Sequence, residues 1–206
     1  SYSGPGSNVL VSAFGGEFCS SHTTVTVDVM GPAGSNNGTS KPDDYAGQPN
    51  YTRCFNGTSA ATPEISGVVA LMLETNPALT WRDVRLVLAK TARKNDPTDS
   101  DWASNGANMP INHKYGYGAA DATAAVNAAK TWVNIAAQKT ATGSATPAVA
   151  IPDAGAAVTS EISLTNSQIS TLEFVELNVT SDHANVGDLE ITLTSPPLTV
   201  STITVP

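Results

Sequence analysis

A serine at the start of a long apolar stretch governs how this chain of 206 residues can fold. The segment reads Phe55-Asn56-Gly57-Thr58-Ser59-Ala60-Ala61-Thr62-Pro63 and runs on into the apolar residues 65–73. Because Asn76-Pro77 follows as a stop signal, the pattern predicts a helix that begins near Ser59. Gly57 allows close backbone approach there. Pro63 is expected to be tolerated, since first-turn N–H groups have no intrahelical partner.

Ser59 is the candidate nucleophile of the chain. Free N–H groups and the positive end of the helix dipole meet at a helix N-terminus, where they stabilise the oxyanion formed when a hydroxyl adds to a carbonyl. The backbone N–H of Ser59 is one such donor. An ordinary N-cap serine is the structural alternative, and the motif around Ser59 argues against it. Ala61 stands where the Gly-x-Ser-x-Gly elbow of α/β-hydrolases needs its second glycine, which disfavours a lipase or esterase of that fold.

The segment from Gly57 to Pro63 resembles the nucleophile segment of the subtilisin-like serine peptidases, in which Gly-Thr-Ser-x-Ala/Ser-x-Pro opens a long central helix. Three later segments resemble the kexin/furin, or proprotein convertase-like, branch in their order and spacing: Leu79-Thr80-Trp81-Arg82-Asp83-Val84, Asp101-Trp102-Ala103-Ser104-Asn105-Gly106 and His113-Lys114-Tyr115-Gly116-Tyr117-Gly118. Residues 183–196 resemble the Gly-Asp-Leu segment of the P domain that follows the catalytic domain in that branch.

This resemblance implies the C-terminal part of an α/β subtilisin-like catalytic domain, with a parallel sheet and flanking helices, followed by a partial all-β jelly-roll P domain. We expect the catalytic part over residues 1–137 and the P-domain part over 158–206. Residues 138–157 between them are rich in Ala, Thr, Ser, Gly and Pro, which is typical of a linker. Both ends look truncated, since the chain begins mid-domain and stops inside a strand pattern.

Local patterns predict the elements of the catalytic part. The β-branched runs 8–13 and 23–29 are expected to be strands of the sheet beneath the active site. The helix after Ser59 is apolar on several faces and is expected to be a buried central helix. A second helix is expected to start at Thr80, with Asp83 completing a capping box, so Asp83 is a cap residue and not a catalytic acid.

The remaining patterns concern the end of the catalytic part and the P-domain part. An alanine-rich helix is expected over about residues 120–132, and the preceding Tyr115-Gly116-Tyr117-Gly118 is expected to serve tight packing and turning. Runs 174–179 and 189–193 alternate with period two and are expected to pair as a β-hairpin.

A catalytic triad also needs a general base and a carboxylate that orients it. Subtilases supply the triad in the order Asp, His, Ser, and His22 is the one histidine before Ser59. His22 lies too close to Ser59 for the family pattern and lacks the His-Gly-Thr context, so it is interpreted as a surface histidine. His113 and His183 follow the serine and are interpreted as packing or surface residues. The catalytic Asp, His and oxyanion-hole Asn are therefore expected upstream of Ser1.

Two functional hypotheses follow from these residues. In the first, the chain belongs to a serine endopeptidase with an acyl-enzyme mechanism, acts on protein or peptide substrates, and is inactive without the missing N-terminal part of the catalytic domain. Cleavage after basic residues is implied by the resemblance alone. In the second, the chain is a non-catalytic binding or scaffold protein derived from a subtilase. The intact motif around Ser59 favours the first hypothesis.

Composition limits the partners and the location. The net charge of −8 argues against nucleic acid or an anionic membrane as partner and fits a secreted protein or basic substrates, although ordinary solubility explains it equally well. No apolar stretch reaches the length of about eighteen residues that spans a bilayer. The family implies a secreted or periplasmic protein. Cys19 and Cys54 either pair, which would contribute about 3–4 kcal/mol, or stay as buried thiols.

Calcium is implied by the resemblance, because convertase-like enzymes bind it through carboxylates and carbonyls. Asp43-Asp44 with Asp28 or Glu17 are candidate ligands, and the alternative is that these are solvated loop acids. Glu64, close to the nucleophile, either tunes the local electrostatic field or faces water.

Overall fold

The computed structural model of the chain describes residues 3–16, 23–29, 50–153, 155–165 and 168–204. By its internal contacts the chain divides into two units, Ser1–Ile135 with Ile191–Thr204 and Ala136–Glu190 with Val205–Pro206. The predicted domain boundaries stay a prediction.

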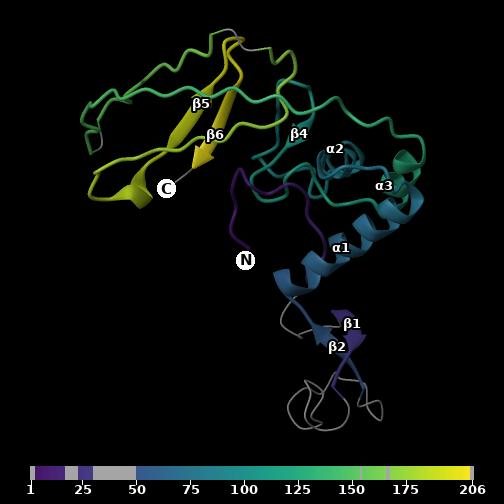
Figure 1. Ribbon diagram of the computed structural model, residues 1–206. Helices are drawn as coiled ribbons and strands as arrows, with labels where there is room; N and C mark the ends of the chain where they lie inside the picture. Colours follow the sequence, from purple (N-terminus) through teal and green to yellow (C-terminus); the bar gives the residue numbers. More distant parts are fainter. Residues whose placement is uncertain (1–2, 17–22, 30–49, 154, 166–167, 205–206) are drawn as a thin grey trace. The chain divides into compact units, whose positions relative to one another are not determined.

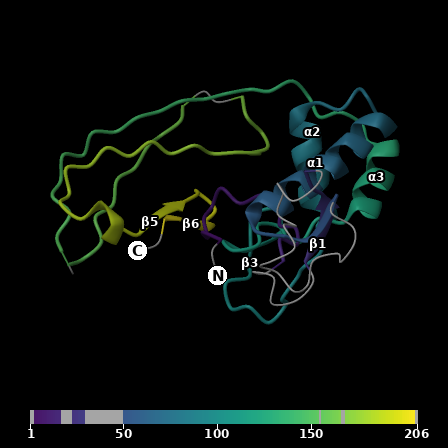
Figure 2. The ribbon, with the colours of Figure 1, turned by 90° about the horizontal axis from the view of Figure 1, so that it is seen from below.

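Helices α1 (Thr58–Thr75), α2 (Trp81–Thr91) and α3 (Ala122–Lys130) form the framework of the first unit. Figures 1 and 2 show α2 and α3 beside the C-terminal part of α1. An apolar core lies where the three helices meet, and its buried members are Met72, Leu79, Val87, Leu88, Ala125 and Ala129. None of the helices in the described part of the chain is long and apolar enough to cross a bilayer.

Helix α2 begins with the predicted capping box. The Thr80 hydroxyl accepts a hydrogen bond from the N–H of Asp83, and the Asp83 carboxylate accepts one from the N–H of Thr80 at 2.9 Å. The other oxygen of this carboxylate accepts from the indole Nε1 of Trp132 and from the N–H of Ile135, each at 2.9 Å. The fully buried Asp83 therefore caps α2 and also holds the segment that follows α3.

Asp83 is expected to make stability depend on pH in the acidic range. Burial raises its pKa, but hydrogen bonds from Thr80, Ile135 and Trp132 outweigh burial and lower the pKa from 3.8 to about 2. A carboxyl group with a lowered pKa stabilises the folded state above its unfolded pKa and loses that contribution as the pH falls through the folded value. Asp83→Asn should therefore reduce the free energy of unfolding by about 2 kcal/mol near neutral pH, and by progressively less between about pH 4 and pH 2.

Urea unfolding followed by circular dichroism, repeated across that pH range, measures the difference between the native chain and Asp83→Asn. The matched control is Glu64→Gln, because Glu64 is an exposed acid on α1. The ionised Asp83 carboxylate would not be the stabilising form if the difference in free energy of unfolding between the native chain and Asp83→Asn stayed constant from about pH 4 to pH 2.

The strands of the first unit form antiparallel pairs. β1 (Thr24–Val27) pairs with β2 (Tyr51–Phe55), β3 (Ala103–Ser104) with β4 (Pro110–Ile111), and β5 (Ile191–Thr194) with β6 (Val200–Thr204). The run 23–29 thus contains the strand predicted for it. The run 8–13 forms no strand, but its Ser12 makes one parallel bridge with Ala119. Among the described residues this bridge is the only parallel pairing, where the sequence predicts a parallel sheet.

Gly116 and Gly118 allow two backbone segments to touch, as predicted for this tyrosine-glycine repeat. Gly116 has φ of +61°, and a Cβ atom at this position would collide with the backbone carbonyl of Leu10. Gly118 has φ of +127°, and a Cβ there would collide with the carbonyl of Arg93. The Leu10 carbonyl accepts a hydrogen bond from the N–H of Tyr117 at 2.8 Å. The close approach is therefore part of the backbone pairing.

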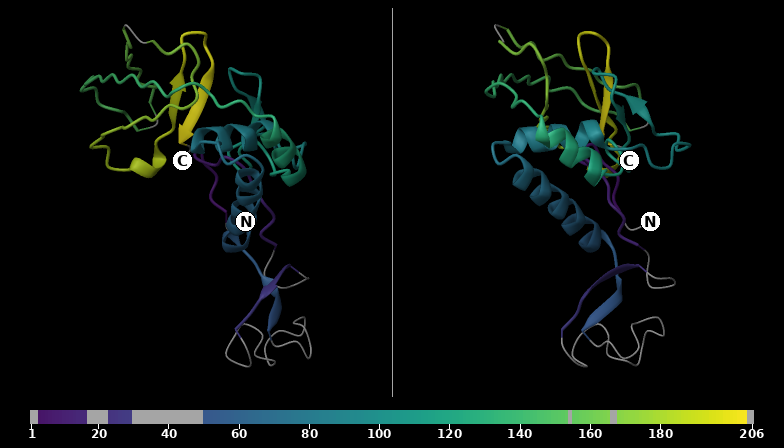
Figure 3. Two further views of the ribbon diagram at one scale, coloured as in Figure 1. Left: turned by 45° about the vertical axis from the view of Figure 1, so that its right-hand side comes forward. Right: turned by 90° about the vertical axis from the view of Figure 1, so that its right-hand side faces the viewer.

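The predicted burial of the central helix is wrong for this chain. Ala60 and Met72 are the buried residues of α1, whereas Leu71 is 50% exposed and Leu73 is 38% exposed. Figure 3 shows the N-terminal part of α1 projecting away from α2 and α3 toward β1 and β2. An apolar composition makes burial favourable, but burial also needs neighbouring elements, and the core covers only the face of α1 that carries Ile65, Val68, Val69 and Met72.

The second unit holds one short 3-10 helix in its described part, η2 (Val186–Asp188), among segments that form neither helix nor strand. The predicted hairpin between residues 174–179 and 189–193 is wrong, since 174–179 forms no strand and β5 pairs with β6. Leu172 and Phe174 are 65% and 62% exposed. Period-two alternation becomes a strand only where a second strand supplies the hydrogen bonds, and residues 174–179 have no such strand in the described part of the chain.

Candidate active site

A sharp turn between β2 and α1 places Ser59 at the start of the helix. Gly57 is the N-cap residue, with φ of 84° and ψ of −174°, a conformation that side-chain-bearing residues rarely adopt. Its N–H donates to the carbonyl of Gly15 at 2.7 Å, and its own carbonyl accepts from the N–H groups of Ala60 and Ala61. Gly57 therefore anchors the turn through both of its backbone polar groups.

The N-terminus of α1 has unused hydrogen-bond donors. Ala60 and Ala61 make the first intrahelical hydrogen bonds, so the N–H groups of Thr58 and Ser59 have no backbone acceptor among the described residues. The first turn carries no acidic residue, and no side chain caps the helix. The positive end of the helix dipole is therefore available to an anion.

Ser59 is the second residue of α1 and is exposed. Its hydroxyl makes no hydrogen bond to any residue that the structure describes. A free hydroxyl next to free N–H donors can add to a carbonyl carbon while the resulting oxyanion is hydrogen-bonded by the helix end. That chemistry is acyl transfer, provided that a general base reaches Ser59.

The predicted reason for the tolerance of Pro63 is wrong. Pro63 is the sixth residue of α1, which lies beyond the first turn. An N–H at this position would donate to the carbonyl of Ser59, and proline has none. Pro63 therefore cannot supply the hydrogen bond that the Ser59 carbonyl would ordinarily accept from the residue four positions on.

Gly57→Ala is expected to strain the turn before Ser59. A residue with a Cβ atom held in such a sparsely populated conformation costs about 1–3 kcal/mol, so we expect the free energy of unfolding to fall by about 2 kcal/mol. Chemical denaturation of the variant measures this loss. Gly4→Ala is the control, because nothing lies within 4 Å of a Cβ at Gly4. Equal stability of the two variants would contradict a strained conformation at Gly57.

The two histidines that the structure describes contact residues other than Ser59. The ring of His113 contacts the Asp101 carboxylate and the Thr202 carbonyl, and the ring of His183 contacts Asp153. His22 lies outside the described residues. Within the described part of the chain the structure thus brings no histidine to Ser59.

The candidate calcium ligands lie largely outside the described residues, since Glu17, Asp43 and Asp44 are among the residues that the structure does not describe. The described residues contain no group of three or more His, Cys, Asp or Glu side chains that could hold a metal ion. Asp28, the remaining candidate, accepts a hydrogen bond from the N–H of Val29 at 2.8 Å. A calcium site therefore stays a prediction.

Cys54 of β2 is disulfide-bonded, and Cys19 lies outside the described residues. The buried Cys54 also uses its carbonyl, which accepts a hydrogen bond from the side-chain amide of Asn56 at 2.9 Å. These contacts fix the end of β2 and the entry into the turn at Gly57.

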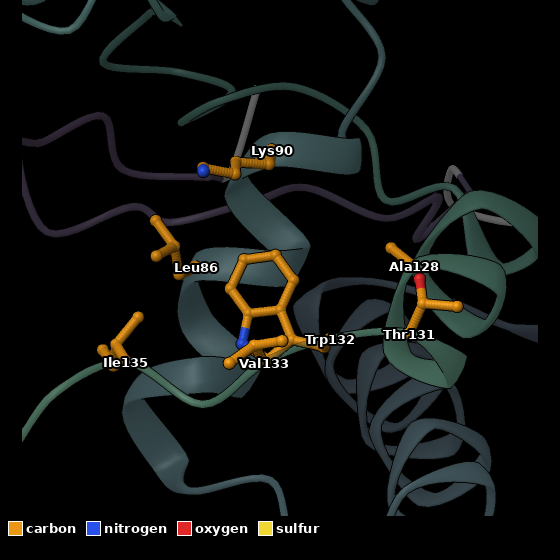
Figure 4. Close-up of a pocket in the computed structure, with 7 residues that line it drawn as sticks. All are labelled: Leu86, Lys90, Ala128, Thr131, Trp132, Val133 and Ile135. Atoms are coloured by element: carbon orange, nitrogen blue, oxygen red, sulfur yellow. The ribbon is translucent and has the colours of Figure 1, made fainter.

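A shallow depression of about 410 Å³ lies between α2, α3 and the segment that follows α3. It is lined by Leu86, Lys90, Ala128, Thr131, Trp132, Val133 and Ile135. Figure 4 shows the Trp132 ring between α2 and α3, and the Lys90 ammonium lies 5.5 Å from the centre of this ring. No residue of α1 lines the depression, which separates it from Ser59.

Sequence reasoning did not assign a role to Gly15. In the structure the Gly15 carbonyl accepts the hydrogen bond from the N–H of Gly57. A pair of glycines indicates a turn or a close approach of the backbone. The local sequence does not indicate which distant segment comes close.

Comparison with known proteins relates this site to a family. The sequence profile of the subtilase family matches residues 6–118, a region that contains β1, β2, α1 and α2 as well as Ser59. The chain belongs to the subtilase family. Its match to the PC3-like endoprotease variant B of Hydra vulgaris is 37% identical over 199 residues. Its match to the human proprotein convertase subtilisin/kexin type 5 is 37% identical over 146 residues.

Solved subtilase structures agree with the fold. The serine protease of Aeromonas sobria matches 100% of the chain with a TM-score of 0.79 and 28% sequence identity. The same protease, solved in complex with a chaperone, matches with a TM-score of 0.80. The chain thus has a subtilase catalytic-domain fold.

The matched regions are parts of longer subtilases. The match to the Hydra protein covers 93% of this chain but 27% of the relative, and the match to human type 5 covers 68% of this chain and 8% of the relative. The match to the Aeromonas protease covers 40% of that chain. The chain therefore spans about a quarter of the length of its Hydra relative.

Proposed function

We propose that the chain is the serine-bearing part of a serine endopeptidase that cleaves protein substrates through an acyl-enzyme. The observation that carries the proposal is an exposed Ser59 at an uncapped helix N-terminus, within the segment that matches the subtilase family. Ser59 attacks the peptide carbonyl, and the N–H of Ser59 stabilises the oxyanion. A histidine from outside this chain takes the proton of Ser59, and water later hydrolyses the acyl-enzyme.

The proposal requires a further part of the catalytic domain. That part supplies the histidine, the orienting aspartate and an oxyanion-hole asparagine, and without it the chain alone is proposed to be inactive. An apolar groove of about 450 Å³ beside α1 is the proposed contact, lined by Leu10, Val11, Thr62, Ile65, Ser66, Val69 and Leu88. An apolar segment of the same domain suits this lining, and the Hydra relative extends far beyond the matched region.

Finer features of the proposal rest on the likeness to proprotein convertases. They are cleavage after basic residues, a structural calcium ion, a secreted or periplasmic location, and a partial jelly-roll P domain over residues 158–206. The net charge of −8 is compatible with basic substrates.

A non-catalytic scaffold is the competing function, because within its described part the chain brings no histidine to Ser59. Labelling of the product of the complete gene with a fluorophosphonate, followed by mass spectrometry, distinguishes the two functions. We expect label on the peptide that contains Ser59, and no label on the 206-residue chain alone. Absence of label on the complete product, under conditions that label another subtilase, would overturn the proposal.

A further inference from the structure

The ring of His113 lies between two hydrogen-bond acceptors. Its Nδ1 lies 3.0 and 3.1 Å from the two carboxylate oxygens of Asp101, and its Nε2 lies 3.0 Å from the backbone carbonyl of Thr202 in β6. A carboxylate and a carbonyl only accept hydrogen bonds, so both contacts are hydrogen bonds only when both ring nitrogens carry a proton. The geometry therefore calls for an imidazolium.

Either neutral tautomer would lose one contact. With the proton on Nε2, the lone pair of Nδ1 would face the Asp101 carboxylate. With the proton on Nδ1, the lone pair of Nε2 would face the Thr202 carbonyl. The contact with Asp101 and the bond to the Thr202 carbonyl raise the pKa of His113 above its ordinary value of 6.5, although partial burial acts in the opposite direction.

We infer that His113 is a pH-sensitive tie that holds the β5–β6 hairpin against the β3–β4 segment of residues 101–113. The two residues are far apart in the sequence, since Thr202 of β6 follows His113 by 89 residues. A second hydrogen bond, from the Ser7 hydroxyl to the Ile203 carbonyl at 3.2 Å, joins the hairpin to the N-terminal segment of the same unit without a titratable group. Loss of the His113 proton therefore loosens the hairpin and leaves this second contact in place.

The charged groups around His113 support this assignment. Asp101 contacts the ring and also accepts a hydrogen bond from the N–H of His113. Lys114 pairs with Asp99 rather than with Asp101, with a separation of 2.6 Å between Nζ and Oδ2. The other elements that touch the tie, residues 3–12, β5 and β6, have no titratable side chains. Asp101 is thus the charged group that contacts the ring of His113 directly.

The direction of the pH effect follows from the sign of the shift. A histidine whose pKa is raised on folding gives its full stabilisation below the unfolded value of 6.5, and that stabilisation is lost as the pH rises through the folded value. The hairpin is therefore held most firmly in mildly acidic solution and least firmly in alkaline solution. This inference does not depend on the proposed peptidase activity.

His183 provides an internal control. Its Nδ1 accepts a hydrogen bond from the N–H of Asn185 at 3.2 Å, and its Nε2 lies 3.1 Å from the Asp153 carboxylate. One acceptor nitrogen and one donor nitrogen are what a neutral imidazole offers. The hydrogen bonds of His183 are therefore complete without a second proton.

Imidazole ¹⁵N spectra of the ¹⁵N-labelled chain report the protonation of each ring nitrogen. We expect His113 to keep two ring protons to a pH above the ordinary pKa value of 6.5. Amide hydrogen exchange of β6, corrected for the intrinsic pH dependence, should show protection falling roughly tenfold from pH 6 to pH 8.5, as the loss of one hydrogen bond to a charged group implies. His113→Gln and Asp101→Asn should remove this pH dependence, whereas His183→Gln should keep it.

A His113 ring that loses its second proton at or below the ordinary pKa value of 6.5 would overturn the inference. So would β6 protection in the native chain that is the same at both pH values. Both of these measurements use the native chain, so they decide the question even if a variant at Asp101 fails to fold.

Discussion

Ser59→Ala in the product of the complete gene is expected to reduce peptide hydrolysis about a million-fold, the scale on which loss of a serine nucleophile acts in this chemistry. The reason is local, because the hydroxyl of Ser59 stands beside the free N–H groups at the start of α1 and no other described serine shares that position. The measurement is the turnover of a peptide substrate at saturating concentration.

Thr75→Ala is the control for Ser59→Ala. Thr75 is the last residue of α1 and donates its hydroxyl hydrogen bond to the Leu71 carbonyl at 2.8 Å. It carries a hydroxyl on the same helix but does not line the apolar groove and has no free N–H groups of the helix N-terminus beside it, so its replacement should leave turnover within a few-fold of the native value. Turnover that survives Ser59→Ala would place the nucleophile elsewhere, and a complete product without any turnover would favour the scaffold.

Gly116→Ala is expected to be the most destabilising of the glycine replacements, with a loss of about 3–5 kcal/mol in the free energy of unfolding. The new Cβ atom would collide with the Leu10 carbonyl, which is backbone and already hydrogen-bonded to Tyr117. A positive φ of 61° adds strain for any residue with a side chain. A flexible side chain could move away, but neither backbone segment can do so without losing its hydrogen bonds.

Gly67→Ala tests whether the loss at Gly116 is specific. Gly67 lies within α1, and nothing lies within 4 Å of a Cβ built there. Alanine is the better helix former by about 1 kcal/mol, so this variant should be as stable as the native chain or more stable. Urea denaturation midpoints measure both variants. A Gly116→Ala midpoint equal to that of Gly67→Ala would contradict the close approach to Leu10.

The candidate site could be predicted largely from local sequence. The start of α1, the glycine before it and the exposed serine all follow from residues within a few positions of Ser59, because helix caps and glycine turns are decided by neighbouring residues. The same holds for the capping box of Thr80 and Asp83, which involves two residues three positions apart. The role of Gly15 in holding Gly57 was not predictable in this way, since the two residues meet only through the fold.

Contacts between distant residues account for what local patterns predict wrongly. β5 pairs with β6 and not with residues 174–179, because strand pairing depends on which segment the fold brings beside β5 to complete its hydrogen bonds. Burial of α1 depends on which elements cover its apolar faces and not on its composition. His113 begins a motif that resembles the convertase-like branch, but it meets Asp101 and Thr202 only after folding. Caps, turns and the serine motif are local, so the amino-acid order alone specifies them; strand partners, burial and the protonation of His113 are non-local, so the folded chain decides them.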